Sequence, residues 1–404
     1  MAHALSAPRD GVPPLAHSAR EIRQAAELLA GGIGPLAVDT ERASGYRYDD
    51  RAFVLQFKRR GAGLVLIDPE GLREVVTAHL APAINGVDWI IHAATTDLPC
   101  LAELGLYPGS LFDTELAGRL AGYSKVNLGA MVEQVLGYEL AKNHGWEDWS
   151  TRPLPADWLT YAALDVELLI ELAEAMSEIL SLQGKLDWAE EEFDYILRTH
   201  DHGLSDMAHT WQDSKGVLGL KSNEQRCVFR ALWTEREKSA RSRDVAVGRV
   251  LSNRAMLAAA RTLPDSPDEL AKVKGFPGRH RGARHKWFQV IAAARNTDPA
   301  TWPGPVRRPH RVPGRSGWAN YPEAEAVLAD VRHSLQDIAD EVDVPLENLL
   351  KPATVRELVW LTVEEHSIVC IGELIDEMTR LEARPWQIGL TAPTMAAVIF
   401  GDRG

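Results

Sequence analysis

The sequence predicts a multidomain α+β protein, in which a mixed β-sheet flanked by helices precedes one or two all-helical domains. Three observations lead to this fold class. Strand-like apolar stretches occur before residue 113, helical periodicity dominates the remainder, and 404 residues are too many for one ordinary hydrophobic core. We expect four segments: a sheet-containing domain over 1–212, a helical domain over 213–298, an exposed linker over 299–317, and a second helical domain over 318–404.

The predicted sheet begins after a short helix. Ser18 and Glu21 have the spacing of a capping box, and apolar residues recur at helical spacing up to Gly31. Short apolar stretches separated by Gly-rich or charged connections are then typical of a three-stranded meander. The expected strands cover 36–41, 53–57 and 64–67, with a further strand over 88–92. Helices over 113–120, 127–136 and 155–180 follow, so we expect a mixed sheet covered by helices.

The rest of the chain follows helical periodicity. One helix is expected over 187–209, at the end of the first domain. The two later domains are expected to be built from helices that cover 222–240, 281–294, 322–341, 345–350, 354–360 and 371–381, with shorter pieces between them. These two domains therefore contribute no strands to the sheet.

Composition and cysteine content limit the class of protein. With 45% hydrophobic and 25% charged residues, the chain has the composition of a folded globular protein. No stretch resembles a signal peptide or reaches the length of a membrane span, so we expect no membrane partner. Cys100, Cys227 and Cys370 are far apart, which favours a reducing, cytoplasmic location over a disulfide framework or a zinc site.

The net charge of −13 is distributed unevenly. Residues 215–317 contain 22 Lys plus Arg against 8 Asp plus Glu, a local balance of +14. A basic block between two acidic ones is the electrostatic pattern of a protein that binds a polyanion, although a solvated helical face is the simpler alternative. The candidate phosphate contacts in this block are Arg241, Arg243, Lys272, Lys274, Arg279, Arg281, Arg284 and Lys286.

Two carboxylates stand at the end of the first predicted strand. Asp39 and Glu41 are two residues apart, so strand alternation places them on the same side of the sheet. Two anions on one face repel each other unless a cation shares them or one binds a proton. Mg²⁺ or Mn²⁺, which prefer oxygen ligands, are suitable cations. The alternative is that these acids are ordinary turn or cap residues.

Further acidic groups occur later in the chain. Asp97 is expected at the first turn of a helix, where it would either stabilise the helix dipole or serve the same site. Tyr161 and Asp165 share one face of a predicted helix, because they are four residues apart. Four carboxylates and a phenol suit phosphodiester hydrolysis, in which two metal ions activate water and stabilise the leaving 3′ oxygen. In this mechanism Tyr161 would orient or deprotonate the water.

These residues carry a family resemblance. Asp39-Thr-Glu41, Asp97 and Tyr161-x-x-x-Asp165 resemble the exonuclease motifs of the DEDD superfamily, in the subgroup with Tyr in the third motif. Phe112-Asp-Thr and Asp148-Trp-Ser-Thr-Arg-Pro-Leu resemble ribonuclease D, and residues 214–296 resemble an HRDC domain, the helicase and ribonuclease D C-terminal module.

The resemblance implies a 3′–5′ exoribonuclease with a ribonuclease H-like core and HRDC-type helical domains. It also implies two divalent metal ions, Mg²⁺ or Mn²⁺, and RNA 3′ ends such as those of tRNA precursors as substrate. By resemblance Asp39, Glu41, Asp97 and Asp165 are metal ligands, and Tyr161 positions the water.

Two features leave alternatives open. The stretch Lys142-Asn-His-Gly-Trp-Glu replaces the Ser and Asp usual before Asp148 in the family, which we interpret as a changed substrate-facing loop. Tyr46 and Tyr48 would either stack on terminal bases or be ordinary loop aromatics. A DNA 3′–5′ exonuclease and a non-catalytic nucleic-acid-binding scaffold are the alternative functions, and the sequence leaves the oligomeric state open.

Overall fold

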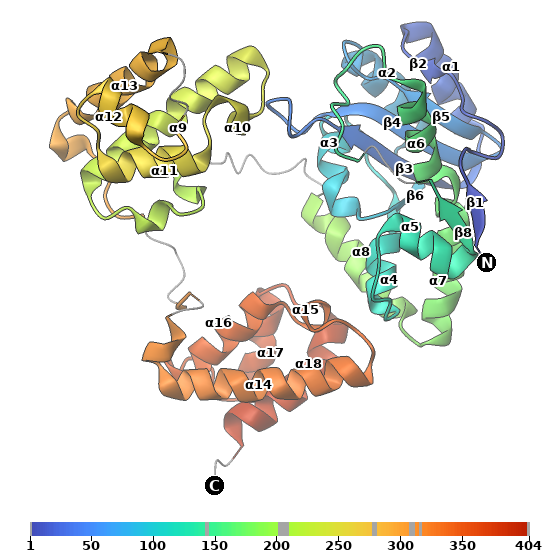
Figure 1. Cartoon of the computed structure of the whole chain (residues 1–404). Helices are drawn as coiled ribbons and strands as arrows, with labels where there is room; N and C mark the ends of the chain where they lie inside the picture. The colour runs from blue at the N-terminus through green and yellow to red at the C-terminus, as the bar shows by residue number, and fades with distance from the viewer. Residues whose placement is uncertain are drawn as a thin grey trace.

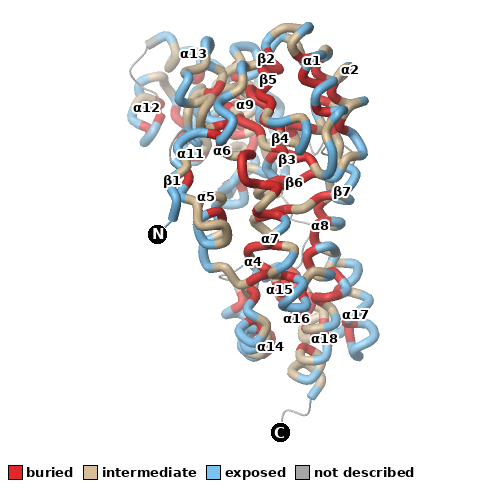
Figure 2. Tube along the Cα trace, turned by 90° about the vertical axis from the view of Figure 1, so that its right-hand side faces the viewer, coloured by how far each residue is buried: buried red, intermediate tan, exposed pale blue. Residues whose placement is uncertain are grey.

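The computed structural model describes residues 2–141, 145–200, 210–276, 281–306, 312–314 and 317–401, with the backbone alone of Arg281. It contains one sheet-bearing domain followed by two all-helical domains, as the sequence predicts (Figure 1). Each of the three has its own buried hydrophobic cluster. Figure 2 shows the buried chain concentrated in the sheet and on the inner sides of the helices. Among the helices described, none combines the length and the hydropathy that a membrane crossing requires.

Within the described residues the main sheet has six strands and is mixed. From edge to edge the strands are β2 (Leu15–Ala16), β5 (Gly63–Ile67), β4 (Ala52–Arg60), β3 (Ile33–Arg42), β6 (Asp88–Ile91) and β7 (Ser110–Asp113). Strands β3, β4 and β5 form the predicted meander with antiparallel pairing, whereas β6 pairs parallel with β3 and β7 pairs parallel with β6. The strand β3 that carries Asp39 and Glu41 therefore lies in the interior of the sheet.

Helices cover this sheet. One half of the predicted capping box is present, because Glu21 N donates to Ser18 Oγ, whereas the Glu21 carboxylate accepts from His17 N, one residue before the N-cap. The helices are α1 (Ala19–Ala30), α2 (Arg73–Ile84), α3 (Leu98–Ala102), α4 (Thr114–Leu120), α5 (Leu128–Met131), α6 (Ala156–Glu167), α7 (Leu169–Leu182) and α8 (Leu186–His200). Helix α6 packs against β3, β4 and β5, and α7 packs against β3 and β6.

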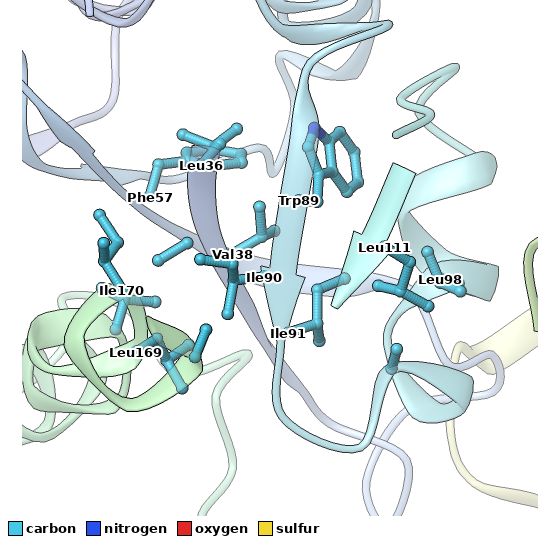
Figure 3. Packing of buried hydrophobic residues seen from close by; sticks show 14 of the residues in the cluster. Leu36, Val38, Phe57, Trp89, Ile90, Ile91, Leu98, Leu111, Leu169 and Ile170 are labelled. Carbon is cyan, nitrogen blue, oxygen red and sulfur yellow. The ribbon is translucent and has the colours of Figure 1, made fainter. Parts of the chain in front are cut away.

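The core of this domain joins strands and helices that are distant in the sequence. Figure 3 shows Leu36 and Val38 of β3 and Ile90 of β6 in one cluster with Leu169 and Ile170 of α7. These side chains alternate with Ala37 and Asp39 along β3, so the strand buries apolar residues on one side while Asp39 and Glu41 project from the other. The apolar cluster thus fixes the strand that presents the two acids.

Some predicted helices differ from the observed ones. The single helix expected over 155–180 is two helices, α6 and α7, which are separated at Leu168, where the backbone leaves helical geometry. The helix expected to end at 136 finishes in a π-helical turn over Val132–Leu136. Strands β1 (His3–Leu5) and β8 (Tyr138–Leu140) form a small parallel sheet that was not predicted, because each is only three residues long. The helix expected over 187–209 is observed as α8, and residues 201–209 lie outside the described part of the chain.

The second domain is a bundle of short helices around one long helix. That long helix begins with a complete capping box between Ser222 and Gln225. The helices are α9 (Asn223–Arg243), α10 (Val247–Val250), α11 (Asn253–Thr262), α12 (Pro267–Lys272) and α13 (Arg281–Arg295). Phe229, Leu232 and Met256 are buried between them.

The third domain is also helical and packs on the first. Its helices are α14 (Pro322–Glu341), α15 (Leu346–Leu349), α16 (Pro352–Val363), α17 (Ile371–Arg380) and α18 (Pro385–Phe400). Arg384 Nε lies 2.7 Å from Glu192 Oε1 of α8, and both side chains are less than 10% exposed. Trp386 stacks on Trp188 of α8 with ring centroids 5.0 Å apart. A buried ion pair and an aromatic stack therefore join this domain to the sheet-bearing one.

Candidate active site

The structure brings three of the predicted acids together. Carboxylate oxygens of Asp39, Glu41 and Asp165 all lie within 4.8 Å of one another. Strand alternation places Asp39 and Glu41 on the same side of β3. Helix α6 crosses that side and brings Asp165 to them, which the sequence spacing alone does not specify.

Asp97 lies in the wall of the same site, held by two hydroxyl groups. Thr40 Oγ1 donates to Asp97 Oδ1 over 2.5 Å, and Thr96 Oγ1 donates to Asp97 Oδ2 over 2.9 Å. Asp97 is 3% exposed and forms the N-cap of the short helix α3, one residue before the first turn where we expected it. Among the described residues, the trio that meets within 4.8 Å does not include Asp97.

All five predicted catalytic residues line one cavity. Its volume is about 230 Å³, and it is open to solvent. Its lining consists of Asp39, Thr40, Glu41, Arg42, His92, Thr96, Asp97, Leu128, Gly145, Tyr161, Asp165 and Leu169. Tyr161 and Asp165, one turn apart on α6, are hydrogen-bonded to each other. The cavity therefore joins strand β3, the start of α3 and helix α6 in one acidic site.

The carboxylates repel one another in a buried setting. Burial and the charges of Asp97 and Asp165 raise the pKa of Asp39 well above its usual range, and burial raises that of Glu41 in the same way. Burial raises the pKa of Asp165 to about 7, while the hydrogen bond from Tyr161 acts in the opposite direction. Arg42 opposes these shifts at Asp39 and Glu41, but one guanidinium does not balance four acids. The set of oxygen donors fits hard divalent cations, whose charge would keep the carboxylates ionised.

Asp113 fixes the turn that leads to Asp97. Asp113 accepts hydrogen bonds from Ala93 N at 3.0 Å and from Ala94 N at 2.8 Å, and it also caps α4 through Glu115 N and Leu116 N. Ala93 has a φ of 63°, a conformation that costs an L-residue free energy and that these bonds stabilise. Asp113 therefore holds the segment that ends in Asp97.

His92 stands beside this turn. Its Nδ1 lies 2.8 Å from Thr114 Oγ1, and burial lowers its pKa to about 4, so the ring is neutral at pH 7. We expect His92 to serve as a packed, hydrogen-bonded wall of the cavity rather than as a cationic contact to phosphate.

The predicted stacking residues Tyr46 and Tyr48 contact the second domain. Tyr48 Oη donates to Glu237 Oε2 over 3.2 Å, and Arg241 of α9 lies over the Tyr48 ring, 5.2 Å from its centroid. Arg249 of α10 lies over the Tyr46 ring at 4.2 Å. Both tyrosines thus belong to the loop between β3 and β4 that touches the basic domain, while base stacking by them stays a prediction.

Ion pairs of Arg47 and Arg51 with Asp244 anchor this loop. Arg51 Nη2 and Nη1 lie 2.8 and 3.1 Å from Asp244 Oδ2 and Oδ1. Asp244 ends α9 with a φ of 46°, and the hydrogen bonds from Arg51 lower its pKa. The contact therefore ties the basic domain to a loop that starts directly after the catalytic strand.

The other predicted phosphate contacts are distributed over the basic domain. Arg243, Lys272 and Lys274 are exposed. Lys286 Nζ lies 2.7 Å from Glu235 Oε1, and Arg284 lies 3.7 Å from Asp268. Arg279 and the side chain of Arg281 lie outside the described residues. A role for these side chains in binding nucleic acid stays a prediction.

Sequence reasoning missed several residues of the site. Thr40 and Arg42 line the cavity, and Arg249 touches the loop after β3. Thr40 and Arg42 flank Glu41 in the sequence, so their proximity was a usable signal. Arg249 had no such signal, because its contact joins residues about 200 positions apart.

Family models match three consecutive parts of the chain. A 3′–5′ exonuclease model matches residues 17–181, an HRDC domain model matches 225–291, and a model of the C-terminal domain of a 3′ to 5′ exonuclease matches 311–399. The five predicted catalytic residues in the cavity all fall within the exonuclease match.

Curated proteins named ribonuclease D are similar in sequence to this chain. A ribonuclease D of Jannaschia sp. is 33% identical over 248 residues, which cover 59% of this chain and 63% of the relative. A ribonuclease D of Nitrobacter hamburgensis is 31% identical over 209 residues, covering 51% of this chain and 53% of the relative. The chain thus spans between half and two thirds of the length of these curated relatives.

Solved structures resemble the whole chain. A protein from Bifidobacterium adolescentis is 34% identical, with a TM-score of 0.86 over 99% of this chain and 100% of that one. Escherichia coli RNase D shares the fold, with a TM-score of 0.67 and 21% identity over 91% of this chain and 98% of that one. By these matches the chain carries a 3′–5′ exonuclease domain followed by an HRDC domain, and it is similar in sequence to proteins named ribonuclease D.

Proposed function

We propose that this protein is a 3′–5′ exoribonuclease that hydrolyses RNA one nucleotide at a time from its 3′ end. The observation that carries the proposal is the cavity in which Asp39, Glu41, Asp97, Tyr161 and Asp165 meet. The curated relatives named ribonuclease D support RNA as the substrate class, and 3′ ends of structured RNAs such as tRNA precursors are the expected substrates.

Two divalent cations, Mg²⁺ or Mn²⁺, fit the acidic donor set. Asp39, Glu41, Asp97 and Asp165 would hold them, since their oxygens line one cavity and their burial leaves negative charge uncompensated. When bound, such ions lower the pKa of water and stabilise charge on the attacking and leaving oxygens of an in-line displacement.

The protein's own groups then position the reactants. Tyr161 orients the attacking water through its hydroxyl group, which lies beside Asp165. Burial and the nearby carboxylates raise the pKa of Tyr161, so the phenol stays protonated at neutral pH and acts by hydrogen bonding rather than as a base. Water attacks the terminal phosphodiester phosphorus, the 3′ oxygen of the preceding nucleotide leaves, and a nucleoside 5′-monophosphate is released.

We also propose a division of labour between the domains. Residues 1–212 perform hydrolysis, and the basic residues of 213–298 supply the positive charge that holds the RNA backbone. Residues 318–404 carry 6 Lys plus Arg against 16 Asp plus Glu, so docking against α8 fits them better than phosphate binding. Residues 299–317 connect the two helical domains.

A time course with 3′-labelled single-stranded RNA tests the proposal. With Mg²⁺ or Mn²⁺ we expect release of labelled nucleoside 5′-monophosphate from the first time point, and with a chelator we expect none. A matched DNA strand in a parallel reaction measures the sugar preference, and slower DNA shortening is the expected result. Labelled fragments of several nucleotides would indicate internal cleavage and would contradict an exonuclease.

A further inference from the structure

One tryptophan beside the active site is almost fully exposed. Trp146 is 94% exposed, the highest fraction among the exposed large hydrophobic residues of the described chain. It lies in the loop before α6, in the stretch where this sequence departs from the residues usual in the family. Exposing a whole indole to water has a free-energy cost, so a surface tryptophan next to a cavity suggests a binding role.

A second cavity continues from the catalytic one past this residue. It has a volume of about 360 Å³ and is lined by Thr40, Glu41, Arg42, Ala43, Ser44, Gly45, Tyr46, Gly145, Trp146 and Glu147. Four of these residues, Thr40, Glu41, Arg42 and Gly145, also line the catalytic cavity. The two hollows therefore form one path that leads from the carboxylates toward the loop after β3.

The walls of this path are held by specific contacts. Tyr46 Oη donates to the backbone oxygen of Trp146 over 3.3 Å, which joins the loop after β3 to the loop before α6. Arg249 donates from Nε to Gly45 O over 2.7 Å while its guanidinium covers the Tyr46 ring. Ala246 N also donates to Tyr46 O over 2.9 Å. The second domain thus contacts the loop after β3, and this loop in turn is hydrogen-bonded to the backbone of Trp146.

The path carries charges of both signs. Its lining holds Arg42, Glu41 and Glu147, and Arg249 lies just beyond it, against Gly45 and Tyr46. Arg42 Nη1 donates to Thr96 O over 2.6 Å, so its guanidinium is held at the catalytic end. Arginines and an exposed aromatic ring along one groove are typical of single-stranded nucleic-acid binding, in which cations follow the backbone and aromatic rings stack on bases.

We propose that this second cavity binds the nucleotide next to the 3′ terminus, and that Trp146 stacks on its base. The inference rests on the proposed exoribonuclease function, in which the terminal nucleotide occupies the catalytic cavity. Its upstream neighbour must then leave along a path that is continuous with that cavity, and the hollow beside Trp146 shares four residues with it. Stacking on a ring face tolerates any base, so Trp146 contributes affinity without selecting a sequence.

A fluorescence experiment measures this stacking without catalysis. Single-stranded RNA carrying 2-aminopurine at the second position from the 3′ end is titrated with the Asp39→Asn protein in Mg²⁺. We expect quenching on binding, because stacking on an indole quenches this base. Adding Trp146→Ala should remove the quenching and weaken binding about 10-fold, whereas adding Trp146→Phe should restore much of both. Leu182→Ala, at a residue 82% exposed on α7, is the matched control and should behave as its parent.

Kinetics separate this proposal from the proposed function. In otherwise unmodified protein, Trp146→Ala should raise KM for a short single-stranded RNA about 10-fold and leave kcat nearly unchanged. For the p-nitrophenyl ester of uridine 5′-monophosphate, which has no upstream nucleotide, KM should stay as in the wild type. If the wild type shortens RNA while Trp146→Ala retains quenching and KM, the stacking proposal is wrong and the exoribonuclease stands. If the wild type does not shorten RNA at all, the proposed function itself fails.

Discussion

Thr40 and Asp97 are joined by a hydrogen bond of 2.5 Å between Thr40 Oγ1 and Asp97 Oδ1, and both residues are at most 5% exposed. Thr40 stands between Asp39 and Glu41 on β3, so this bond links the strand of two acids to the segment that supplies the fourth. The Thr40 hydroxyl group therefore helps to set the position of Asp97 relative to the other carboxylates.

Removing that hydroxyl should affect both stability and activity. Thr40→Val keeps the shape of the side chain but leaves a buried carboxylate oxygen without its donor, at a cost of about 1 to 3 kcal/mol. We expect a lower denaturant midpoint and RNA hydrolysis reduced about 10-fold in kcat. Thr40→Ser, which keeps the hydroxyl, should remain close to the wild type in both measurements. Equal activity in Thr40→Val would show that Asp97 needs no such support.

Metal binding should strengthen as pH rises. The raised pKa values mean that the folded, metal-free protein holds protons that the unfolded chain has released, so its stability falls as pH rises from about 4 toward the Asp165 pKa of about 7. Those protons compete with cations for the carboxylates, and their loss favours metal. Calorimetric titration with Mn²⁺ at pH 6 and pH 8 should give a lower Kd at pH 8.

The same titration with Asp165→Asn provides the comparison. The amide cannot bind a proton in this range, so we expect weaker binding overall and a smaller change in Kd between the two pH values. A wild-type Kd that is independent of pH would contradict raised pKa values in the cluster.

The ion pair between Arg51 and Asp244 should hold the HRDC domain against the catalytic one. Asp244→Asn removes the charge but keeps a residue that tolerates the positive φ at the end of α9. We expect a larger radius of gyration by small-angle scattering and a raised KM for RNA, because Arg249 and Tyr46 lose their fixed alignment. Asp268→Asn, at a side chain that is 91% exposed, is the control and should change neither quantity.

The buried pair between Glu192 and Arg384 should dominate the attachment of the third domain. Arg384→Leu leaves Glu192 buried and unpaired beside Trp386, which costs about 3 to 5 kcal/mol when a buried pair is broken. We expect a clear drop in Tm, or a separate early transition, by calorimetry. The double change Glu192→Leu with Arg384→Leu should recover part of the loss. No recovery would point to packing rather than charge as the cause.

Sequence periodicity was sufficient for the parts of the site that depend on local geometry. Alternation along β3 places Asp39 and Glu41 on one side, and the four-residue spacing places Tyr161 beside Asp165. These relationships follow from the backbone repeat of a strand and a helix, and the structure shows both.

Contacts between segments that are distant in the sequence could not be predicted from periodicity. Tyr48 contacts α9, and Arg249 lies over the Tyr46 ring. Both contacts depend on how two domains pack against each other, which the periodicity of a single helix or strand does not predict. The break at Leu168 was missed because apolar residues continue across it with helical spacing. The exposure of Trp146 could not be predicted from the sequence either. A tryptophan in a loop can be exposed or buried, and Trp149, three residues later, is buried.

If the carboxylates of the cavity perform the hydrolysis, neutralising one of them must slow a single turnover. Glu41→Gln and Glu178→Gln carry the same chemical change, but Glu178 is an exposed residue of α7 outside the cavity. With 3′-labelled RNA and saturating Mg²⁺, we expect Glu41→Gln to be slower by at least about 100-fold and Glu178→Gln to match the wild type. A Glu41→Gln rate equal to that of Glu178→Gln would contradict the assignment of the active site.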